Sequence, residues 1–518
     1  MKIVTASQIQ ALDRRTIEDA QIPGSQLMEK AGQGVVRTLE QVCTSFAGRA
    51  AVVLSGKGNN GGDGLVVANL LLRKRVKPTV LLLAHPRDLS SDAKLMYRRF
   101  VRAAGTSAVH ANPSGDQIRK HLHRDNVLVI DALLGTGLSS PVTGSYRTAI
   151  ESINACGHPV MAIDLPSGIH ADTGAVMGAA VMATWTVTLG LPKLGLFVGA
   201  GIDHAGQVHV ADIGIPPEYV ASLKTDLTLI TGEEIRQLLP RRPRSAHKGT
   251  FGHVGMIAGS VGKTGAAAMA ARAAMRVGAG LVTVATPSGV NDTLEAKLLE
   301  VMTVPMPETK AHTLARSGLD RLLLFANSRT AVALGPGLTT HPETVDLIHA
   351  LIPRLEKPSV LDADALNAVA GRADLLMECK APLILTPHPG EMARLQEHAT
   401  PQTINADRIG SAAGFARARR VIVVLKGART VLAAPDGPVA ICPTGNPGMA
   451  TAGTGDVLTG MISGLLAQGL APWDAARCGT YLHGLAGDLA ANRLGATGMI
   501  AGDLIEQIPH AVSQITQS

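Results

Sequence analysis

A glycine-rich stretch, residues 446–456 (NPGMATAGTGD), places the strongest constraint on how this chain can fold. It ends in the carboxylate of Asp456, and apolar residues with helical spacing follow at once, over residues 457–466. We expect a loop that opens into a helix, with residues 453–455 at its N-terminus. Unpaired N–H groups and the helix dipole attract anions there, and glycine lets a phosphoryl group approach the main chain closely. Asp456 is then placed to orient a substrate hydroxyl and accept its proton.

Taken alone, a Gly-x-Gly-Asp string also fits a glycine-rich turn with an aspartate near a helix N-cap. The flanking chain therefore has to decide between a plain turn and a phosphate site. Short apolar runs in the first half predict buried strands, and they cover residues 50–54, 79–83, 127–130, 160–163 and 185–189. Helical segments separate several of them, which is typical of a parallel, doubly wound α/β sheet. A glycine-rich loop, residues 55–64, follows the first run, and we expect an apolar helix to begin at Leu65.

Polar side chains follow three of these strands. Asn60 lies in the first loop, Asp131 follows the third run, and Asp164 and Ser167 follow the fourth. Residues just past the carboxyl ends of strands in a doubly wound sheet meet in one crevice, so we expect these four residues to share a site. Each alone would more often cap a turn, but three polar loops at three strand ends favour a site. Their oxygens suit a hard cation as well as a hydroxylated substrate.

Two glycine-rich strings look like nucleotide motifs but fail the full pattern. Residues 56–61 (GKGNNG) match the dinucleotide fingerprint, which also needs an acidic residue at the end of the next strand, where His85 and Pro86 stand. Residues 259–265 (GSVGKTG) look like a P-loop, yet Ile257 stands where a Walker sequence needs its first glycine. The sequence therefore disfavours an ordinary nicotinamide oxidoreductase, although the first loop can still cradle phosphates.

Together, these features resemble the NAD(P)HX epimerase family, which interconverts the two epimers of hydrated NADH or NADPH. The resemblance covers roughly residues 1–220 and rests on residues 8–32, residues 59–64 and both aspartate loops. It implies a potassium ion at Asn60, Asp131 and Ser167, with Asp164 as the catalytic residue. It also implies hydrate contacts from Asn59, Asn60, Gly61, Gly62, Asp63, Gly135, Thr136, Gly137, Leu138, Ser139, Ser140, Pro141, Tyr146 and Asp164.

The second half repeats the alternation of buried strands and polar loops, with different motifs. We expect strands at residues 253–258, 281–285, 331–334, 359–361, 383–385 and 421–425. Three of them lead into the loops 362–367 (DADALN), 386–391 (TPHPGE) and 426–430 (KGART). Lys426 and Arg429 are candidates for phosphate contact, because both side chains are cationic and only donate hydrogen bonds. His388 alone would more often be a hydrogen-bonded structural histidine than a catalyst.

These loops, together with residues 453–456, resemble the ribokinase-like superfamily and, within it, the nucleotide-dependent NAD(P)HX dehydratases. The motifs span nearly all of residues 245–510. The resemblance implies that the nucleotide, expected to be ADP with Mg²⁺, contacts Lys426, Gly427, Ala428, Arg429, Thr430 and Gly455. It implies hydrate contacts from Ala266, Gly337, His388 and Asp456, with Asp456 as the catalytic residue. The fusion of both domains in one chain resembles the bifunctional repair enzymes of bacteria.

The length of 518 residues favours two domains or more. We expect an N-terminal Rossmann-like doubly wound sheet in residues 1–221 and a C-terminal ribokinase-like α/β sandwich in residues 222–518. The net charge is only +7, and the chain has 2 Trp, 4 Tyr and 6 Phe, so we expect no nucleic-acid partner. Scattered cysteines, no signal peptide and no long apolar run predict a cytoplasmic protein with no membrane span. The expected partners are NADHX or NADPHX, ADP and further copies of the chain in a homo-oligomer.

Three functions are compatible with these features. The favoured one is repair, in which hydrated NAD(P)H is epimerised and its S form is dehydrated to NAD(P)H, with AMP and phosphate as products if ADP is used. A ribokinase-type small-molecule kinase with an accessory nucleotide-binding domain would instead release a stable phosphorylated alcohol. A non-enzymatic nucleotide-binding or scaffold protein would need neither Asp164 nor Asp456, so these two residues argue against it.

Overall fold

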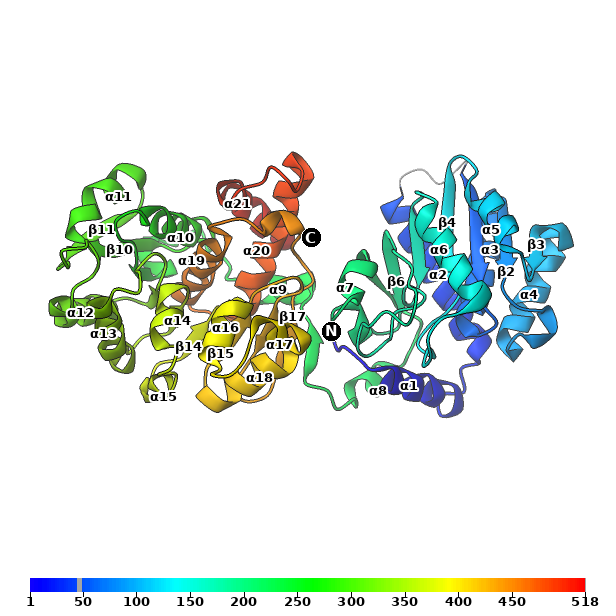
Figure 1. Cartoon of the computed structure of the whole chain (residues 1–518), viewed down its shortest axis with the longest axis horizontal. Helices are drawn as coiled ribbons and strands as arrows, with labels where there is room; N and C mark the ends of the chain where they lie inside the picture. Colours follow the sequence, from blue (N-terminus) through cyan, green and yellow to red (C-terminus); the bar gives the residue numbers. More distant parts are fainter. Residues whose placement is uncertain (44–48, 518) are drawn as a thin grey trace. The chain divides into compact units, whose positions relative to one another are not determined.

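The computed structural model of the chain describes residues 1–43 and 49–517. The chain forms two compact units, Met1–Thr225 and Asp226–Ser518, each with its own sheet (Figure 1). The boundary expected after residue 221 falls between the last helix of the first unit, α8 (Pro217–Ala221), and the first strand of the second, β8 (Leu227–Leu229).

The first unit contains a seven-stranded sheet in the order β3-β2-β1-β4-β5-β6-β7, and every neighbouring pair is parallel. The strands are β1 (Ala50–Ser55), β2 (Pro78–Leu82), β3 (Val109–Ala111), β4 (Val127–Ala132), β5 (Val160–Ile163), β6 (Trp185–Leu189) and β7 (Gln207–Ala211). The helices are α1 (Ala6–Glu18), α2 (Gly24–Val42), α3 (Asn59–Arg73), α4 (Ser91–Ala104), α5 (Gly115–Leu122), α6 (Gly144–Ala155), α7 (Gly201–His204) and α8. Apolar residues of α2, α3 and α4 form the core on one face of the sheet, and those of α5 and α6 form it on the other. This is the doubly wound, Rossmann-like arrangement that the sequence predicts.

The start of α3 differs from the expectation of a helix beginning at Leu65. The helix begins at Asn59, so the glycine-rich residues 59–64 are its first turns and not a loop. The glycines allow this because the helix lies hard against the sheet: a Cβ at Gly61 would overlap the carbonyl oxygen of Gly56, and one at Gly64 would lie 2.5 Å from Cβ of Ala132. The short edge strands β3 and β7 also escaped the sequence prediction.

The second unit contains a ten-stranded sheet in the order β11-β10-β9-β12-β13-β14-β15-β16-β17-β8. All neighbouring pairs are parallel except those that β16 makes with β15 and β17. The strands after β8 are β9 (His253–Ile257), β10 (Leu281–Pro287), β11 (Met302–Met306), β12 (Ala331–Leu334), β13 (Ser359–Leu361), β14 (Leu383–Leu385), β15 (Ile422–Leu425), β16 (Val431–Ala433) and β17 (Val439–Ile441).

Helices cover both faces of this sheet, with a separate apolar core on each face, which is the α/β sandwich that the sequence predicts. They are α9 (Gly232–Leu238), α10 (Thr264–Arg276), α11 (Asn291–Lys297), α12 (Leu319–Asn327), α13 (Pro342–Leu351), α14 (Asp364–Val369), α15 (Leu375–Glu378), α16 (Pro389–Leu395), α17 (Pro401–Ala406), α18 (Arg408–Arg419), α19 (Thr454–Ala467), α20 (Pro472–Leu494) and α21 (Ala501–Gln517). The strands missed from sequence, β8, β11, β16 and β17, lie toward the two edges of the sheet, and three of them have only three residues.

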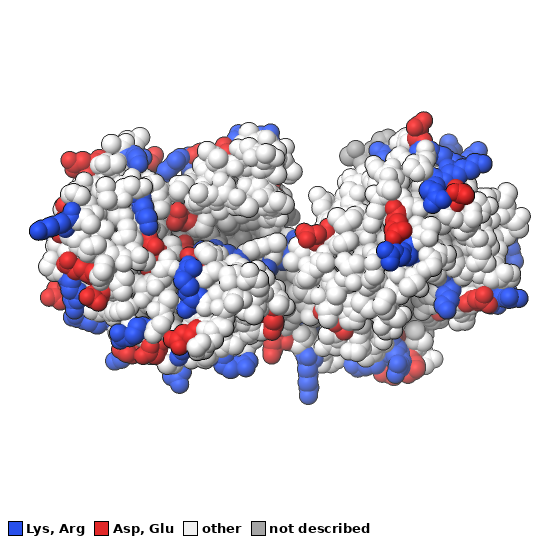
Figure 2. Space-filling view, in the orientation of Figure 1, with Lys and Arg blue, Asp and Glu red and all other residues white. Residues whose placement is uncertain are grey.

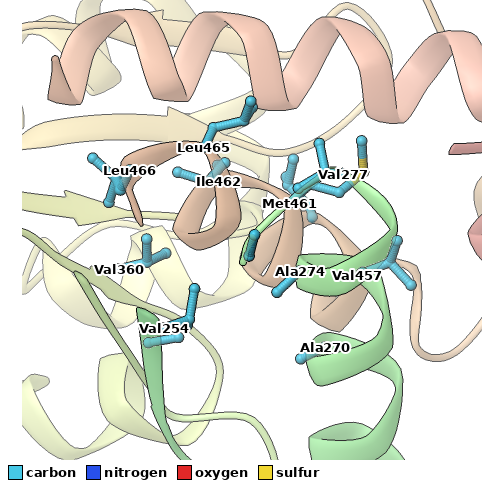
Figure 3. Close-up of a cluster of buried hydrophobic side chains, with 14 of the residues drawn as sticks. Val254, Ala270, Ala274, Val277, Val360, Val457, Met461, Ile462, Leu465 and Leu466 are labelled. Carbon is cyan, nitrogen blue, oxygen red and sulfur yellow. The ribbon is translucent and has the colours of Figure 1, made fainter. Parts of the chain in front are cut away.

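Helices α10 and α19 pack against each other at very short range, because small residues line their contact. A Cβ at Gly460 of α19 would overlap the carbonyl oxygen of Ala270 in α10, and one at Gly464 would lie 2.6 Å from Cγ1 of Val277. Figure 3 shows the resulting core, in which the alanines of α10 lie beside the larger apolar side chains of α19. This contact fixes the position of α19, whose first turn carries Asp456.

Charged side chains of both signs are interspersed over the face of each unit drawn in Figure 2. All five cysteines are free. In the part of the chain that the structure describes, no helix has the length and apolar character needed to cross a bilayer.

Candidate active sites of the two units

A cavity of about 1200 Å³ lies in the first unit, at the carboxyl ends of β1, β4 and β5. Eleven of the residues predicted to contact a hydrate line it: Asn59, Asn60, Asp63, Gly135, Thr136, Gly137, Leu138, Ser139, Ser140, Tyr146 and Asp164. Gly61, Gly62 and Pro141 are not among the lining residues; Gly61 and Gly62 pack against Gly56 and Met28 behind the cavity wall.

Asp164 follows β5 and has a positive φ of 68°, a backbone conformation that non-glycine residues seldom adopt. Its Oδ1 accepts hydrogen bonds from the Leu189 N–H at 3.1 Å and from the Lys193 ammonium at 2.5 Å. Its other oxygen, Oδ2, lies 3.7 Å from the place a Cβ would take at Gly135, so the carboxylate faces the loop that follows β4. One oxygen is therefore anchored in the protein, while the carboxylate still lines the cavity.

Lys193 is a functional candidate that the sequence analysis missed. Its side chain is 1% exposed and also donates to the carbonyl of Leu189 at 2.6 Å. A lysine is seldom buried unless it is paired, so its ion pair with Asp164 is the reason it can occupy this position. The signal was present in the sequence, because Lys193 is the only charged residue in the apolar run 185–202.

Asp13 is a second residue that the sequence analysis assigned no role, although it lies in the matched opening segment. It lines the same cavity from α1, on the helix face that buries Ile9, Leu12 and Thr16. Burial, opposed in part by Lys193, raises the pKa of Asp13 to about 6. Burial also raises the pKa of Asp63 well above its ordinary value, with Asp164 as the next cause. The cavity thus brings Asp13, Asp63 and Asp164 together with one buried lysine.

The three residues predicted to hold potassium come together beside this cavity. Ser167 donates from its hydroxyl to Oδ1 of Asp131 at 2.6 Å and from its backbone N–H to Oδ2 at 2.8 Å. The Asn60 amide donates to the carbonyl of Leu134 at 3.0 Å, and the Ser167 hydroxyl lies 3.2 Å from that same oxygen. Asn60 and Ser167 therefore meet at one backbone carbonyl, and Ser167 links this point to Asp131.

The donor set at this point fits a hard monovalent cation. Oδ1 of Asn60 is buried and has no hydrogen-bond partner, an arrangement that costs free energy unless something else satisfies the oxygen. Burial raises the pKa of the fully buried Asp131 to about 6, although hydrogen bonds from Ser167 oppose this shift. A cation would satisfy the amide oxygen and also favour the charged form of the carboxylate.

Asp456 is the centre of the site in the second unit. The helix α19 begins at Thr454, and its N-cap Gly453 has a φ of 91°, which glycine adopts without strain. Asp456 therefore lies in the first turn, as the sequence predicts. Burial, followed by the negative charge of Asp362, raises the pKa of Asp456 to about 7. His483 of α20 is buried and its Nε2 donates to the carbonyl of Thr454 at 2.8 Å, which ties this helix start to α20.

A buried ion-pair cluster lies next to Asp456. The Lys426 ammonium is 2.7 Å from Oδ1 of Asp362, and it is 3.6 Å from Oε2 of Glu391. Burial lowers the pKa of Lys426, but the two carboxylates outweigh burial and raise it overall. The other oxygen of Asp362 accepts from the Thr459 hydroxyl at 2.7 Å. Since a Cβ at Gly455 would lie 3.3 Å from the Lys426 ammonium, this cation faces the start of α19.

The other residues predicted to contact the hydrate are Ala266 and Gly337, which lie next to each other, and His388, which lies beside Glu391 of this cluster. A Cβ at Gly337 would lie 3.4 Å from Cβ of Ala266, so these two predicted contacts are side by side. His388 is the N-cap of α16; its Nδ1 accepts from the Gly390 N–H at 3.0 Å, and its backbone N–H donates to Glu391 at 2.8 Å. His388 therefore has a structural role, and its half-exposed ring is also available to a ligand.

The predicted nucleotide loop, residues 426–430, is held from behind by Arg408. The guanidinium of Arg408 donates to the carbonyls of Leu425 at 2.9 Å, of Ala428 and of Arg429 at 3.4 Å. The Arg429 guanidinium itself donates to the carbonyl of Pro443. In this structure, therefore, both cations predicted to meet phosphate are bonded to protein groups.

Comparisons with known proteins match both units. A family model described as "NAD(P)H-hydrate dehydratase" matches residues 254–510, and one described as "YjeF-related protein N-terminus" matches residues 24–195. A bifunctional NAD(P)H-hydrate repair enzyme from Moorella thermoacetica is 46% identical and covers 100% of this chain and 98% of its own length. The enzyme of the same name from Escherichia coli K12 is 36% identical, covering 94% of this chain and 89% of its own.

Among solved structures, the ADP/ATP-dependent NAD(P)H-hydrate dehydratase of Bacillus subtilis, co-crystallised with ATP/Mg²⁺, is 32% identical. It covers 56% of this chain and 98% of its own length, with a TM-score of 0.49. The full-length identity to the Moorella and Escherichia enzymes decides the assignment. This chain belongs to the family of bifunctional NAD(P)H-hydrate repair enzymes.

Proposed function

We propose that the chain repairs hydrated NADH and NADPH in two steps, one in each unit. Residues 1–221 interconvert the R and S epimers, and residues 222–518 convert the S epimer to NAD(P)H at the expense of a nucleotide. One observation carries the proposal: in a chain matched over its full length by a bifunctional relative, each unit has its own aspartate centre, the buried Asp164 in one and the half-buried Asp456 in the other.

In the first unit, the hydrate occupies the cavity at the carboxyl ends of β1, β4 and β5. A volume of about 1200 Å³ is more than a drug-sized ligand needs, as suits a dinucleotide. Asp164, held by Lys193, acts on the carbon that bears the hydroxyl. A potassium ion at Asn60, Asp131 and Ser167 would supply positive charge beside residues 135–141, which contact the hydrate.

In the second unit, Asp456 takes the proton of the hydrate hydroxyl while that oxygen bonds to the terminal phosphorus of the nucleotide. The bond from this phosphorus to the bridging oxygen breaks, and AMP leaves if the nucleotide is ADP. The carbon–oxygen bond then breaks with loss of phosphate, a far better leaving group than hydroxide, and loss of a proton from the neighbouring carbon forms the double bond. The pKa of about 7 suits Asp456 to proton transfer near neutral pH.

The nucleotide lies over residues 426–430 and Gly455, where the Lys426 ammonium faces the start of α19. We expect ADP to be preferred to ATP, because the fusion of the two domains resembles the bacterial enzymes. Mg²⁺ would neutralise charge on the phosphates, which are among its usual ligands in nucleotide sites. Five free cysteines support action in a reducing compartment such as the cytoplasm.

The test measures the rate of NAD(P)H recovery from the pure S hydrate and from a mixture of epimers. ADP and ATP are compared at equal concentrations. Asp456→Asn should slow dehydration about a hundred- to ten-thousand-fold, the usual cost of losing a general base, and leave epimerisation intact. Asp164→Asn should slow epimerisation and leave dehydration intact. With an epimer mixture, this variant should convert the S fraction quickly and then recover NAD(P)H only slowly. A stable phosphorylated alcohol without NAD(P)H would identify a kinase instead, and faster turnover with ATP would reject the ADP preference. Loss of both activities in either folded variant would reject the assignment of two sites.

A further inference from the structure

The cavity of the first unit contains a carboxyl group without a partner. Oδ1 of Asp13 is buried and accepts no hydrogen bond, although the side chain lines the cavity. A buried carboxyl oxygen without a partner is costly, so its presence in a native protein calls for an explanation, and a catalytic role is one. Asp13 is therefore a group for which the fold itself provides no structural use.

The first residues of the chain position Asp13 beside the cavity, because they fix the start of α1. Val4 forms a parallel bridge with Lys193, in which the Val4 N–H donates to the carbonyl of Pro192 and the Leu194 N–H donates to that of Val4. The next residues start α1 with a capping box on Thr5, and the Ala6 N–H donates to Asp172 at 2.6 Å. The same contacts that position α1 thus tie it to the segment that carries Lys193.

Two charged groups from other segments act on this carboxyl. Lys193 favours its ionised form, whereas Asp164 after β5 disfavours it. Asp13 in turn helps to raise the pKa of Asp63 on α3. Burial is the largest influence and raises the pKa of Asp13 to about 6. The remaining ionisable residues of the cavity are Lys57, His85, Arg87, Asp88, Asp92 and Tyr146. Asp164, by contrast, is bonded directly to a lysine.

We propose that Asp13 is a second catalytic residue of the N-terminal unit, paired with Asp164 as proton donor and acceptor for the hydroxyl of the hydrate. This inference rests on the proposed epimerisation and adds a proton route to it. One site thus holds a carboxyl bonded to a lysine and a carboxyl oxygen without a partner, and two carboxyl groups in different environments suit paired acid and base catalysis.

The reaction can be written with its protons balanced. Adding water to the enamine double bond of a dihydropyridine puts the hydroxyl on the carbon next to the ring nitrogen. Asp13 gives its proton to that hydroxyl; the carbon–oxygen bond breaks, water forms, and the nitrogen lone pair makes a carbon–nitrogen double bond. Water then adds to the opposite face, the lone pair returns to nitrogen, and Asp164 takes the released proton. The reverse reaction starts with the proton on Asp164 and returns it to Asp13.

The experiment compares the full-length wild type with Asp13→Asn and Asp13→Glu. The matched control is Asp19→Asn, at the exposed C-cap of the same helix. Interconversion of pure R and pure S hydrate is measured without nucleotide, in ¹⁸O-labelled water. In Asp13→Asn, kcat for interconversion and the rate of label uptake should fall together about a hundred- to ten-thousand-fold, with KM unchanged. Asp13→Glu should recover part of the loss, and Asp19→Asn should match the wild type. In the wild type, kcat/KM should decline as the pH rises through about 6, because Asp13 then loses the proton it donates.

Four results would overturn the inference. They are an unchanged kcat in Asp13→Asn, a loss seen only in KM, epimerisation by the wild type without label uptake, and an Asp13 carboxyl that titrates below about 4 by ¹³C NMR of the wild type, its ordinary range. The NMR measurement needs no variant, so it decides the question even if Asp13→Asn misfolds. Dehydration of the S epimer by the same chain reports the second unit. A wild type that does not interconvert the epimers at all would reject the proposed function itself, which is a different outcome.

Discussion

The ammonium of Lys193 lies 2.5 Å from Oδ1 of Asp164, inside a pocket where the lysine side chain is 1% exposed. Removing one partner of a buried ion pair leaves the other charge without compensation. We therefore expect Lys193→Met to slow epimerisation and to lower the free energy of unfolding of the first unit by about 3–5 kcal/mol.

Denaturant titration checks this expectation. Trp185 lies in the first unit and Trp473 in the second, so a Trp473→Phe background lets fluorescence follow the first unit alone. Lys120→Met on the surface of α5 is the control and should change neither activity nor stability. An unfolding curve of Lys193→Met that overlays the control would show that the ion pair contributes no stability.

Potassium should stabilise the folded first unit, because a ligand that binds only the native state raises its stability. We expect the thermal midpoint to be higher in potassium chloride than in tetramethylammonium chloride at equal ionic strength. Ser167→Ala removes one of the three predicted ligands and should reduce this difference, whereas Ser107→Ala, distant in sequence from them, should keep it. Equal midpoints in both salts for the wild type would argue against a cation site at Asn60, Asp131 and Ser167.

The rate of dehydration should depend on pH through Asp456. Burial and the charge of Asp362 raise the pKa of this aspartate to about 7, and only its ionised form accepts a proton. The value of kcat/KM for the S hydrate should therefore rise as the pH increases through about 7 and level off above it. Asp362→Asn removes a neighbouring negative charge, so the rise of kcat/KM with pH should move to lower pH, whatever the effect of the substitution on the maximal rate.

Asp436→Asn provides the control for that profile, because Asp436 is exposed on the turn between β16 and β17. Its pH profile should coincide with that of the wild type. If kcat/KM of Asp362→Asn rises at the same pH as that of the wild type, another group sets the pH dependence.

Gly460→Ala should lower both the stability of the second unit and its rate of dehydration. The new methyl group would overlap the carbonyl oxygen of Ala270, and overpacking of this kind typically costs about 1–3 kcal/mol. Gly414→Ala in α18 is the matched control, since a Cβ there meets no atom within 4 Å and alanine favours a helix. Thermal unfolding and the dehydration rate should separate the two variants, with epimerisation unchanged in both. Equal stability of the two would mean that the helices can move apart at little cost.

The parts of the site that depend on local signals could be predicted from the sequence. The start of α19 follows from Gly453 and the apolar residues after it, and it is confirmed. The prediction that Asn60, Asp131, Asp164 and Ser167 follow strands at one edge of a parallel sheet needed only the strand order, and the bonds around Leu134 bring three of them together.

The parts of the site that could not be predicted from the sequence depend on contacts between segments that are far apart in the chain. Asp13 and Lys193 are 180 residues apart, and they meet because Val4 pairs with Lys193, a bridge that no local pattern specifies. The ion pair between Lys426 and Asp362 also joins distant segments. The sequence predicts Lys426 as a free cation for phosphate, whereas in the structure its ammonium is already bonded to Asp362. The predicted helix start at Leu65 was wrong for a related reason, since the glycines of residues 59–64, which favour a loop in isolation, here allow close packing of α3 on the sheet.

The glycine contact between α10 and α19 also bears on how this chain can diverge. Elsewhere in the core, one large side chain can shrink while its neighbour grows, so drift can proceed by compensating pairs of substitutions. At Gly460 the neighbour is a carbonyl oxygen of the main chain, which no substitution can remove. We therefore expect an alignment of dehydratase units to vary freely at Met461 and Leu465 but to keep a glycine at 460, although that residue touches neither substrate nor nucleotide.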